Sequence, residues 1–169
     1  MKAIFKRWVL PAIYVLLLAL FINRFVLFQI VVTSGSMSPT INTGDHILIL
    51  RHYVPQDMRT GDVVVFKNEE EGNRHLVIKR LIGTPGDHII FEEGNIILNG
   101  EPLEETYVDF CDCFSGEFNI PQGRYFFCGD CRSNSKDSRD YSVGCIAEDD
   151  ILGTAGLRIW PLSRFGFIH

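Results

Sequence analysis

No acidic side chain occurs in the first 32 residues, although the 169-residue chain contains 21 aspartates and glutamates. The same stretch carries four basic residues, Lys2, Lys6, Arg7 and Arg24. Residues 33–169 therefore hold the other 12 basic side chains against all 21 acidic ones, a net charge of −9. Phosphate backbones require clustered lysines and arginines, so we expect no nucleic-acid partner.

The chain also lacks a second long apolar run. Trp8 to Ile22 is uncharged but spans only 15 residues, whereas a bilayer core needs about 20. Apolar residues resume at Phe25–Phe28, and Arg24 can reach the headgroups, so we expect one transmembrane anchor over residues 8–28. The basic residues of segment 1–7 predict a cytoplasmic tail and place residues 29–169 on the outer side of the membrane.

A cleaved signal peptide is the alternative interpretation of this N-terminus. A signal peptide also begins with charged residues followed by an apolar stretch, and both features are present here. No small-x-small cleavage site follows the apolar run, however, which favours a retained anchor.

Residues 33–169 contain no long stretch of helical periodicity and no internal repeat. Short apolar, largely β-branched runs occur instead, separated by Gly-Asp, Asn-Gly and Pro-containing turns. The clearest of these runs are 47–50, 63–66, 88–98, 124–128 and 151–160. Residues 88–98 read as a hairpin that turns at 93–95. The pattern predicts a mostly β fold, an antiparallel β-barrel or sandwich, in one domain behind the N-terminal helix.

Two short motifs carry the chemistry. Ser34-Gly35-Ser36-Met37-Ser38-Pro39-Thr40 begins just after the apolar N-terminus, and Ile78-Lys79-Arg80 lies within an apolar run of its own. A serine hydroxyl needs a base to take its proton, and a lysine amine serves only while it is neutral. Desolvation among apolar groups lowers the lysine pKa by roughly 3–5 units from about 10.4. The two motifs together therefore predict a serine–lysine dyad.

Each motif alone has a simpler interpretation. The serine-rich stretch is typical of a turn, and a lone lysine in an apolar strand is typical of a protected sheet edge. Histidine is the other candidate base, because His75 lies four residues before Lys79 and would point to the same side of a strand. A Ser–His–Asp triad is thus an alternative, although no triad motif frames any of the five histidines.

In these motifs the chain resembles the bacterial type I signal peptidases, the membrane-bound serine endopeptidases that remove signal peptides from exported proteins. Residues 34–40 look like the nucleophile box of that family, and residues 61–66 like its next conserved strand. Residues 78–87 look like its general-base box, and residues 129–139 like its last box. Four boxes in order behind an apolar segment make the resemblance specific, and it covers nearly the whole chain.

The resemblance implies a role for each polar residue of the site. Ser36 stands in the place of the nucleophile and Lys79 in that of the general base. The Ser34 hydroxyl and the Ser36 backbone N–H would stabilise the oxyanion. Ser135 would hold the neutral Lys79 amine, since a carboxylate in its place would raise the lysine pKa.

Charged residues alternate in the last box. Asp137 and Arg139 would face the same side of an extended segment, which predicts an ion pair that steadies the Ser135 loop. Asp130 and Arg132 repeat the pattern and are expected to pair likewise. Apolar residues that flank the catalytic positions are expected to form the walls of a shallow substrate groove: Ile30, Val32 and Ile78.

The last box departs from the family pattern at three places. Cys131 stands where the family usually has Asn, and Ser133 stands where Asp is usual. Residues 140–144 replace a shorter aromatic-Gly ending. None of these departures removes a proposed catalytic group, but each bears on the geometry of the loop.

Five cysteines in an outward-facing domain invite disulfides and leave at least one thiol unpaired. One structural disulfide, a Cys₄ zinc site, a Cys-x-x-Cys redox pair and buried free thiols are the alternatives. The spacing assigns no partners among Cys111, Cys113, Cys128, Cys131 and Cys145. We expect neither a metal ion nor a cofactor, because the base and the oxyanion donors are built into the chain.

The sequence therefore predicts a single-pass enzyme of the bacterial cytoplasmic membrane, with an exocytoplasmic catalytic domain. Its expected partners are the lipid bilayer and exported preproteins whose signal peptides carry small residues at positions −1 and −3. One alternative within the same fold is a specialised peptidase that matures pilin or conjugation proteins. An alternative of another class is a membrane-tethered metal or thiol-redox module that uses the cysteines.

Overall fold

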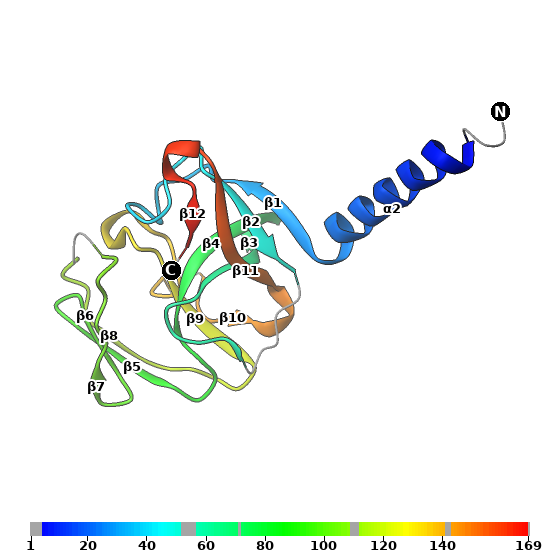
Figure 1. Ribbon diagram of the computed structural model, residues 1–169. Helices are drawn as coiled ribbons and strands as arrows, with labels where there is room; N and C mark the ends of the chain where they lie inside the picture. Colours follow the sequence, from blue (N-terminus) through cyan, green and yellow to red (C-terminus); the bar gives the residue numbers. More distant parts are fainter. Residues whose placement is uncertain (1–4, 52–56, 71, 109–111, 141–142, 169) are drawn as a thin grey trace.

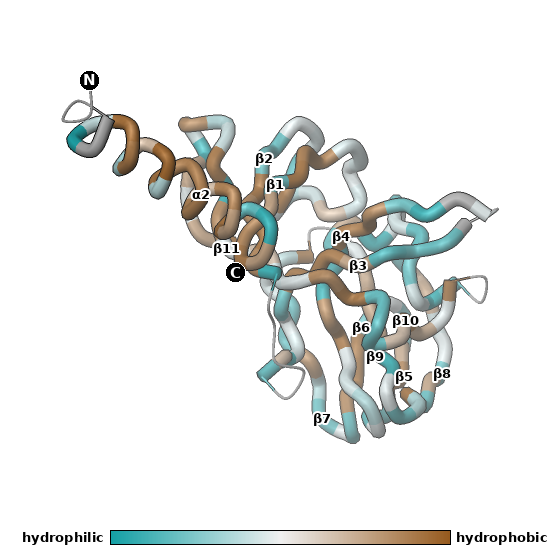
Figure 2. The backbone as a smooth tube through the Cα atoms, turned by 90° about the vertical axis from the view of Figure 1, so that its right-hand side faces the viewer, coloured by the Kyte–Doolittle hydropathy of each residue, from teal (hydrophilic) through white to brown (hydrophobic). Residues whose placement is uncertain are grey.

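The N-terminal apolar segment forms one helix that stands away from the rest of the protein (Figure 1). The computed structural model describes residues 5–51, 57–70, 72–108, 112–140 and 143–168. A π-helical turn, Phe5–Val9, leads into α2, Leu10–Phe25. The 19 residues Arg7–Phe25 are long and apolar enough to cross a membrane, and none of them is buried against the body. In Figure 2 most of this helix has the brown colour of hydrophobic residues.

The helix ends earlier than the sequence predicts. Leu27 and Phe28, expected within the anchor, belong to strand β1, Leu27–Val31. They pair with Leu50 and Ile49 of β2, His46–Leu50. The apolar character of 27–28 thus comes from a strand that follows the helix, which hydropathy alone does not distinguish from more of the anchor.

The larger sheet has eight strands and carries the body of the protein. Its order is β1-β2-β11-β3-β4-β9-β10, with β12 beside β11, and every pairing is antiparallel. The remaining members are β3 (Val63–Glu70), β4 (Asn73–Gly83), β9 (Arg124–Cys128), β10 (Ile146–Ala147), β11 (Ile151–Trp160) and β12 (Gly166–Phe167). In the described residues β1 and β10 are not paired with each other, so the sheet does not close into a barrel.

A smaller antiparallel sheet is inserted between β4 and β9. Its order is β7-β6-β5-β8. The strands are β5 (His88–Glu92), β6 (Asn95–Leu98), β7 (Glu101–Pro102) and β8 (Gly116–Asn119). The predicted hairpin is confirmed, and its tight turn places Glu93 and Gly94 at positive φ, 48° and 84°. Short 3₁₀ turns occur at Arg132–Asn134, Glu148–Asp150 and Leu162–Arg164.

The core explains why both motifs of the predicted dyad are apolar around their polar residue. Met37, which follows Ser36, is 0% exposed, and Ile78, which precedes Lys79, is 7% exposed. Both belong to one cluster with Val32, Ile41, Ile47, Ile49, Val63 and Val65. Burial of an aliphatic side chain contributes about 1.5–3 kcal/mol. Packing of their neighbours therefore brings the serine loop and the lysine strand together.

The mostly β prediction and the strand runs are confirmed, with one further difference. The β3–β4 hairpin extends beyond the predicted run 63–66, because Glu69 and Glu70 belong to β3 and pair with Arg74 and Asn73 of β4. The backbone N–H and C=O groups of these residues find partners within the β3–β4 ladder.

Candidate active site

Ser36 lies in the loop that follows β1. Backbone bonds hold the base of this loop: Val32 N–H donates to Asp45 O at 2.9 Å, and Gly44 N–H donates to Val32 O at 2.8 Å. Met37 at the core anchors the residue after the serine. The loop therefore presents Ser36, 7% exposed, at a defined position.

Lys79 approaches Ser36 from β4, where it pairs with Val64 of β3. Its Nζ lies 2.5 Å from Ser36 Oγ in a hydrogen bond between residues 43 positions apart. The lysine is 4% exposed. Burial lowers the pKa of Lys79 below its ordinary value, although the charges of Asp137 and Asp130 act in the opposite direction. A neutral amine at hydrogen-bond distance is able to accept the hydroxyl proton.

The lowered pKa of Lys79 makes folding stability depend on pH. The folded state binds fewer protons than the unfolded state between the lowered pKa and the ordinary value of 10.5, so stability rises with pH across that window. We expect the free energy of unfolding of the native chain to increase with pH relative to a Lys79→Met variant. Chemical denaturation of both proteins at a series of pH values measures the difference. Parallel pH curves would contradict the buried, deprotonated lysine.

The oxyanion position has one candidate side chain. Ser34 Oγ lies 3.4 Å from Ser36 Oγ, on the same loop. A hydroxyl here can donate to a charge that develops beside the nucleophile.

Ser135 packs, like Ser36, against Gly129, but no hydrogen bond joins it to Lys79 among the described contacts. Its Oγ is buried away from water, and Ser135 helps to lower the pKa of Asp137. Gly129 explains how closely the two loops pack, since a Cβ at this position would lie 2.3 Å from Ser135 Oγ and 2.4 Å from Ser36 O. The expected role of Ser135 as a partner of the lysine stays a prediction.

The Asp137–Arg139 ion pair is present in the structure. Arg139 Nε donates to Asp137 Oδ1 at 2.8 Å, and Arg139 Nη2 donates to Oδ2 at 3.0 Å. Asp137 Oδ2 also accepts from Gly129 N–H at 2.9 Å. Although burial alone would raise it, the pKa of Asp137 is lowered by the arginine and this backbone N–H. The Asp137 carboxylate therefore links the Arg139 side chain to the backbone of Gly129, which packs against Ser36.

The predicted Asp130–Arg132 pair is wrong. Asp130 instead forms a two-pronged ion pair with Arg80, at 2.8 Å (Nε–Oδ1) and 2.7 Å (Nη2–Oδ2). Arg132 pairs with Glu105 and donates from Nε to Gly129 O at 3.0 Å. The 3₁₀ turn that begins at Arg132 explains the error, because residues i and i+2 share a side only in an extended strand.

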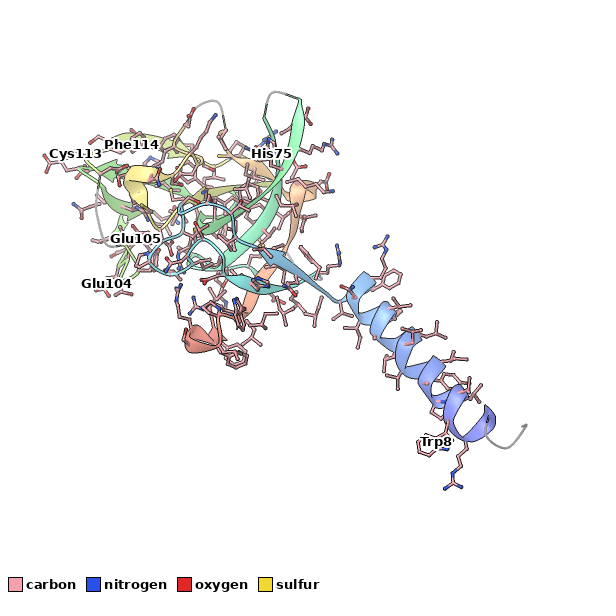
Figure 3. The ribbon with its side chains drawn as sticks, turned by 90° about the horizontal axis from the view of Figure 1, so that it is seen from above. Trp8, His75, Glu104, Glu105, Cys113 and Phe114 are labelled. Atoms are coloured by element: carbon pink, nitrogen blue, oxygen red, sulfur yellow. The ribbon has the colours of Figure 1, made fainter. Side chains whose placement is uncertain are left out.

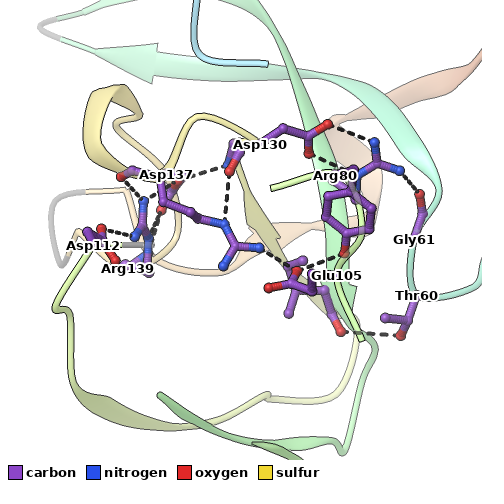
Figure 4. Close-up of polar contacts among 12 residues, drawn as sticks. Thr60, Gly61, Arg80, Glu105, Asp112, Asp130, Asp137 and Arg139 are labelled. Atoms are coloured by element: carbon purple, nitrogen blue, oxygen red, sulfur yellow. Dashed lines mark hydrogen bonds and ion pairs between the residues drawn. The ribbon is translucent and has the colours of Figure 1, made fainter. Parts of the chain in front are cut away.

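Sequence reasoning also missed residues that hold this network from elsewhere in the chain (Figure 4). Arg80 was read only as the residue after Lys79, and its position in an apolar strand was the signal that it needed a buried acid. Glu105 and Asp112, which pairs with Arg139, lie between β7 and β8 and carry no local signal.

A cleft of about 370 Å³ opens beside the serine. It contains the three expected groove residues, and its full lining is Gln29, Ile30, Val31, Val32, Thr33, Ser34, Ser36, Val65, Leu76, Val77 and Ile78. Two strand edges border it. Among the described residues β1 pairs only with β2, and β9 pairs with β4 only at residues 80–83. The 76–78 stretch of β4 therefore has a free edge toward the cleft.

The described histidines make their contacts away from Ser36. His75 is exposed on the β3–β4 hairpin (Figure 3), His46 contacts Gln29, and His88 contacts Glu117. His52 and His169 lie outside the described residues. The hydrogen bonds of Ser36 Oγ join it to Lys79 and Ser34, so the geometry favours lysine over histidine as the base.

Cys113, Cys128, Cys131 and Cys145 are free thiols, so the alternative of a disulfide among these four is not realised. Burial raises the pKa of the Cys128 thiol, the reverse of what a reactive thiolate requires. No group of three or more potential metal-binding side chains occurs in the described part of the chain. Cys111 and residues 141–142 lie outside it. Cys131, where the family usually has Asn, donates its N–H to Ser36 O at 3.0 Å.

Comparison with known proteins identifies the family. The family model described as "Signal peptidase, peptidase S26" matches residues 5–160. A probable signal peptidase I-2 of Synechocystis sp. is 34% identical over 158 residues, which cover 90% of this chain and 72% of that protein. Signal peptidase IB of Staphylococcus aureus is 28% identical over 187 residues, covering 99% of this chain and 95% of that protein.

A solved signal peptidase I from Enterococcus faecalis is similar at 27% identity with a TM-score of 0.48, covering 58% of this chain and 96% of that one. The family model extends from the N-terminal helix to the end of β11, and the Synechocystis relative aligns over most of both proteins. This chain therefore belongs to the signal peptidase family of S26 peptidases.

Proposed function

We propose that this protein is a membrane-anchored serine endopeptidase that removes signal peptides from exported preproteins, with Ser36 as nucleophile and Lys79 as general base. The observation that carries the proposal is the 2.5 Å contact between a buried lysine amine and a serine hydroxyl. The serine also lines an apolar cleft of about 370 Å³. Family membership supplies the reaction class.

The reaction follows from this arrangement. Ser36 Oγ attacks the scissile carbonyl carbon while its proton passes to Lys79 Nζ. The Ser34 hydroxyl and the Ser36 N–H donate to the oxyanion, and loss of one such donor typically costs about 10²–10³ in rate. When the intermediate collapses, Lys79 returns the proton to the leaving amine. The neutral amine then deprotonates a water molecule, which attacks the acyl carbon. When this second intermediate collapses, the bond from the acyl carbon to Ser36 Oγ breaks and Lys79 returns the proton to Oγ.

The cleft favours an extended substrate with small side chains. Free edges of β1 and of the 76–78 stretch of β4 border it, so a substrate strand can add backbone hydrogen bonds there. Ile30, Val32 and Ile78 line the apolar wall. Large side chains near the cleaved bond would clash with this wall, which accounts for a preference for small residues at −1 and −3.

The N-terminal helix supports a membrane location. Arg7–Phe25 is exposed along its whole length, as an element in contact with lipid would be. Basic residues at its start and the acidic body at its end favour a cytoplasmic N-terminus and an exocytoplasmic catalytic domain. We propose that the helix is retained as an anchor in the bacterial cytoplasmic membrane.

The two alternative functions require different sites, and the structure bears on each separately. A specialised pilin or conjugation-type peptidase would use the same site, and no contact described here distinguishes it. A metal or thiol-redox module would need clustered or reactive cysteines, whereas Cys128 is buried with a raised pKa. The site therefore supports a peptidase.

Cleavage of a preprotein tests the proposal. We expect the detergent-solubilised full chain to cut a preprotein whose signal peptide ends in Ala-x-Ala, directly after the second alanine. A leucine in place of that alanine should abolish the cut, and N-terminal sequencing of the product locates it. A variant with both Cys113→Ser and Cys131→Ser should keep the activity. No cleavage of any preprotein, or activity lost only with the cysteines, would favour the thiol module.

A further inference from the structure

Three buried arginines lie in the network behind the catalytic pair, and each needs a negative partner. The side chains of Arg80 and Arg132 are 1% exposed and that of Arg139 is 6% exposed. Asp130 pairs with Arg80, and Asp137 with Arg139, so the catalytic loop supplies two acids for three cations. A buried charge without a partner is strongly unfavourable.

Glu105 supplies the missing charge from outside the loop. Its side chain is 10% exposed and pairs with Arg132. The same oxygen, Oε1, accepts from Tyr107 O–H at 2.7 Å. The Tyr107 ring in turn lies over the Arg80 guanidinium, with 3.8 Å from the ring centroid to Cζ. One segment of the small-sheet insertion thus holds two of the three arginines (Figure 4).

The contacts continue from Glu105 to the nucleophile. Arg132 Nε donates to Gly129 O at 3.0 Å. Gly129 packs so closely that a Cβ there would lie 2.4 Å from Ser36 O. Cys131 N–H, next to Arg132, donates to that same carbonyl at 3.0 Å. The position of Arg132 therefore determines how the loop supports the backbone of Ser36.

We propose that Glu105 is a positioning residue for the Ser36–Lys79 dyad, acting through Arg132 on the loop that supports Ser36. The proposal rests on the proposed function. It assigns the segment between β7 and β8 a part in the reaction although none of the described residues of that segment lines the cleft. Loss of the Glu105 charge should consequently lower kcat and leave KM nearly unchanged.

Glu105→Gln tests this, and the neighbouring Glu104→Gln is its matched control. Both glutamates lie on the same segment (Figure 3), but Glu104 is exposed. On an Ala-x-Ala preprotein, we expect Glu105→Gln to lower kcat by about 10- to 100-fold, the cost of a misplaced catalytic group, with KM within about twofold. Glu104→Gln should match the native chain. Equal kcat values for the two variants would overturn the proposal, as would a rise in KM at constant kcat.

A second variant covers the case in which Glu105→Gln does not fold. Tyr107→Phe keeps the ring over Arg80 and removes only the hydroxyl that donates to Glu105. We expect a smaller fall in kcat, at unchanged KM, in protein whose melting temperature lies well above the assay temperature. A native kcat for Tyr107→Phe, in the absence of folded Glu105→Gln, would overturn the proposal. Failure of the proposed function is distinguishable, because the native chain would then not cleave the preprotein, or Lys79→Ala would cleave it as fast as the native chain.

Discussion

Replacing Lys79 with alanine is expected to lower kcat/KM on a preprotein by about 10⁴-fold or more, as removal of a nucleophile-activating base does in other serine hydrolases. The physical reason is the 2.5 Å contact between Lys79 Nζ and Ser36 Oγ, which no other base shares among the described residues. Ser36→Ala should have an effect of the same size, because the two residues act as one unit. Rates of product formation on an Ala-x-Ala preprotein measure both.

Lys67→Ala is the matched control for this substitution. Lys67 lies on β3, next to the strand that carries Lys79, but its side chain is exposed. It should leave the rate unchanged. Substantial activity in Lys79→Ala would point to a histidine base instead, with His75 the first to replace. Activity that survives Ser36→Ala would refute the nucleophile assignment itself.

Asp130→Asn is expected to lower the free energy of unfolding by about 3–5 kcal/mol, the typical cost of breaking a buried ion pair by removing one partner. Asp130 is 0% exposed and Arg80 is 1% exposed, so neither water nor salt can compensate the remaining charge. Arg80 would keep its bond to Gly61 O at 2.6 Å and its contact with the Tyr107 ring. Those contacts do not neutralise a guanidinium. Denaturant titration followed by intrinsic fluorescence measures the loss.

Two further variants identify the cause of that loss. Asp149→Asn removes an exposed carboxylate and should change stability by less than about 0.5 kcal/mol. A double variant, Arg80→Met with Asp130→Leu, removes both charges and should recover most of the stability lost in Asp130→Asn. If Asp130→Asn were as stable as Asp149→Asn, the Arg80–Asp130 pair would not be a main support of the loop.

The sequence by itself determined the strand pattern and was enough to predict a serine–lysine dyad. Ser36 and Lys79 each stand beside residues that must be buried, Met37 and Ile78, so local hydrophobicity was enough to predict a desolvated amine. Short apolar, largely β-branched runs and Asn-Gly or Gly-Asp turns were likewise enough for the strands, because strand preference and turn chemistry are local properties. Local spacing also predicted the Asp137–Arg139 pair, which the structure contains.

Only the tertiary structure decided which residues neutralise the other buried charges. The partners of Arg80 and Arg132 are Asp130 and Glu105, 50 and 27 positions away. Spacing predicts which side chains share a face within one element, whereas the partner of a buried charge depends on which distant segment packs over it. The sequence placed the end of the N-terminal helix at residue 28 instead of Phe25 for a related reason. Apolar residues suit a membrane helix and a strand equally until β2 is in place to pair with β1.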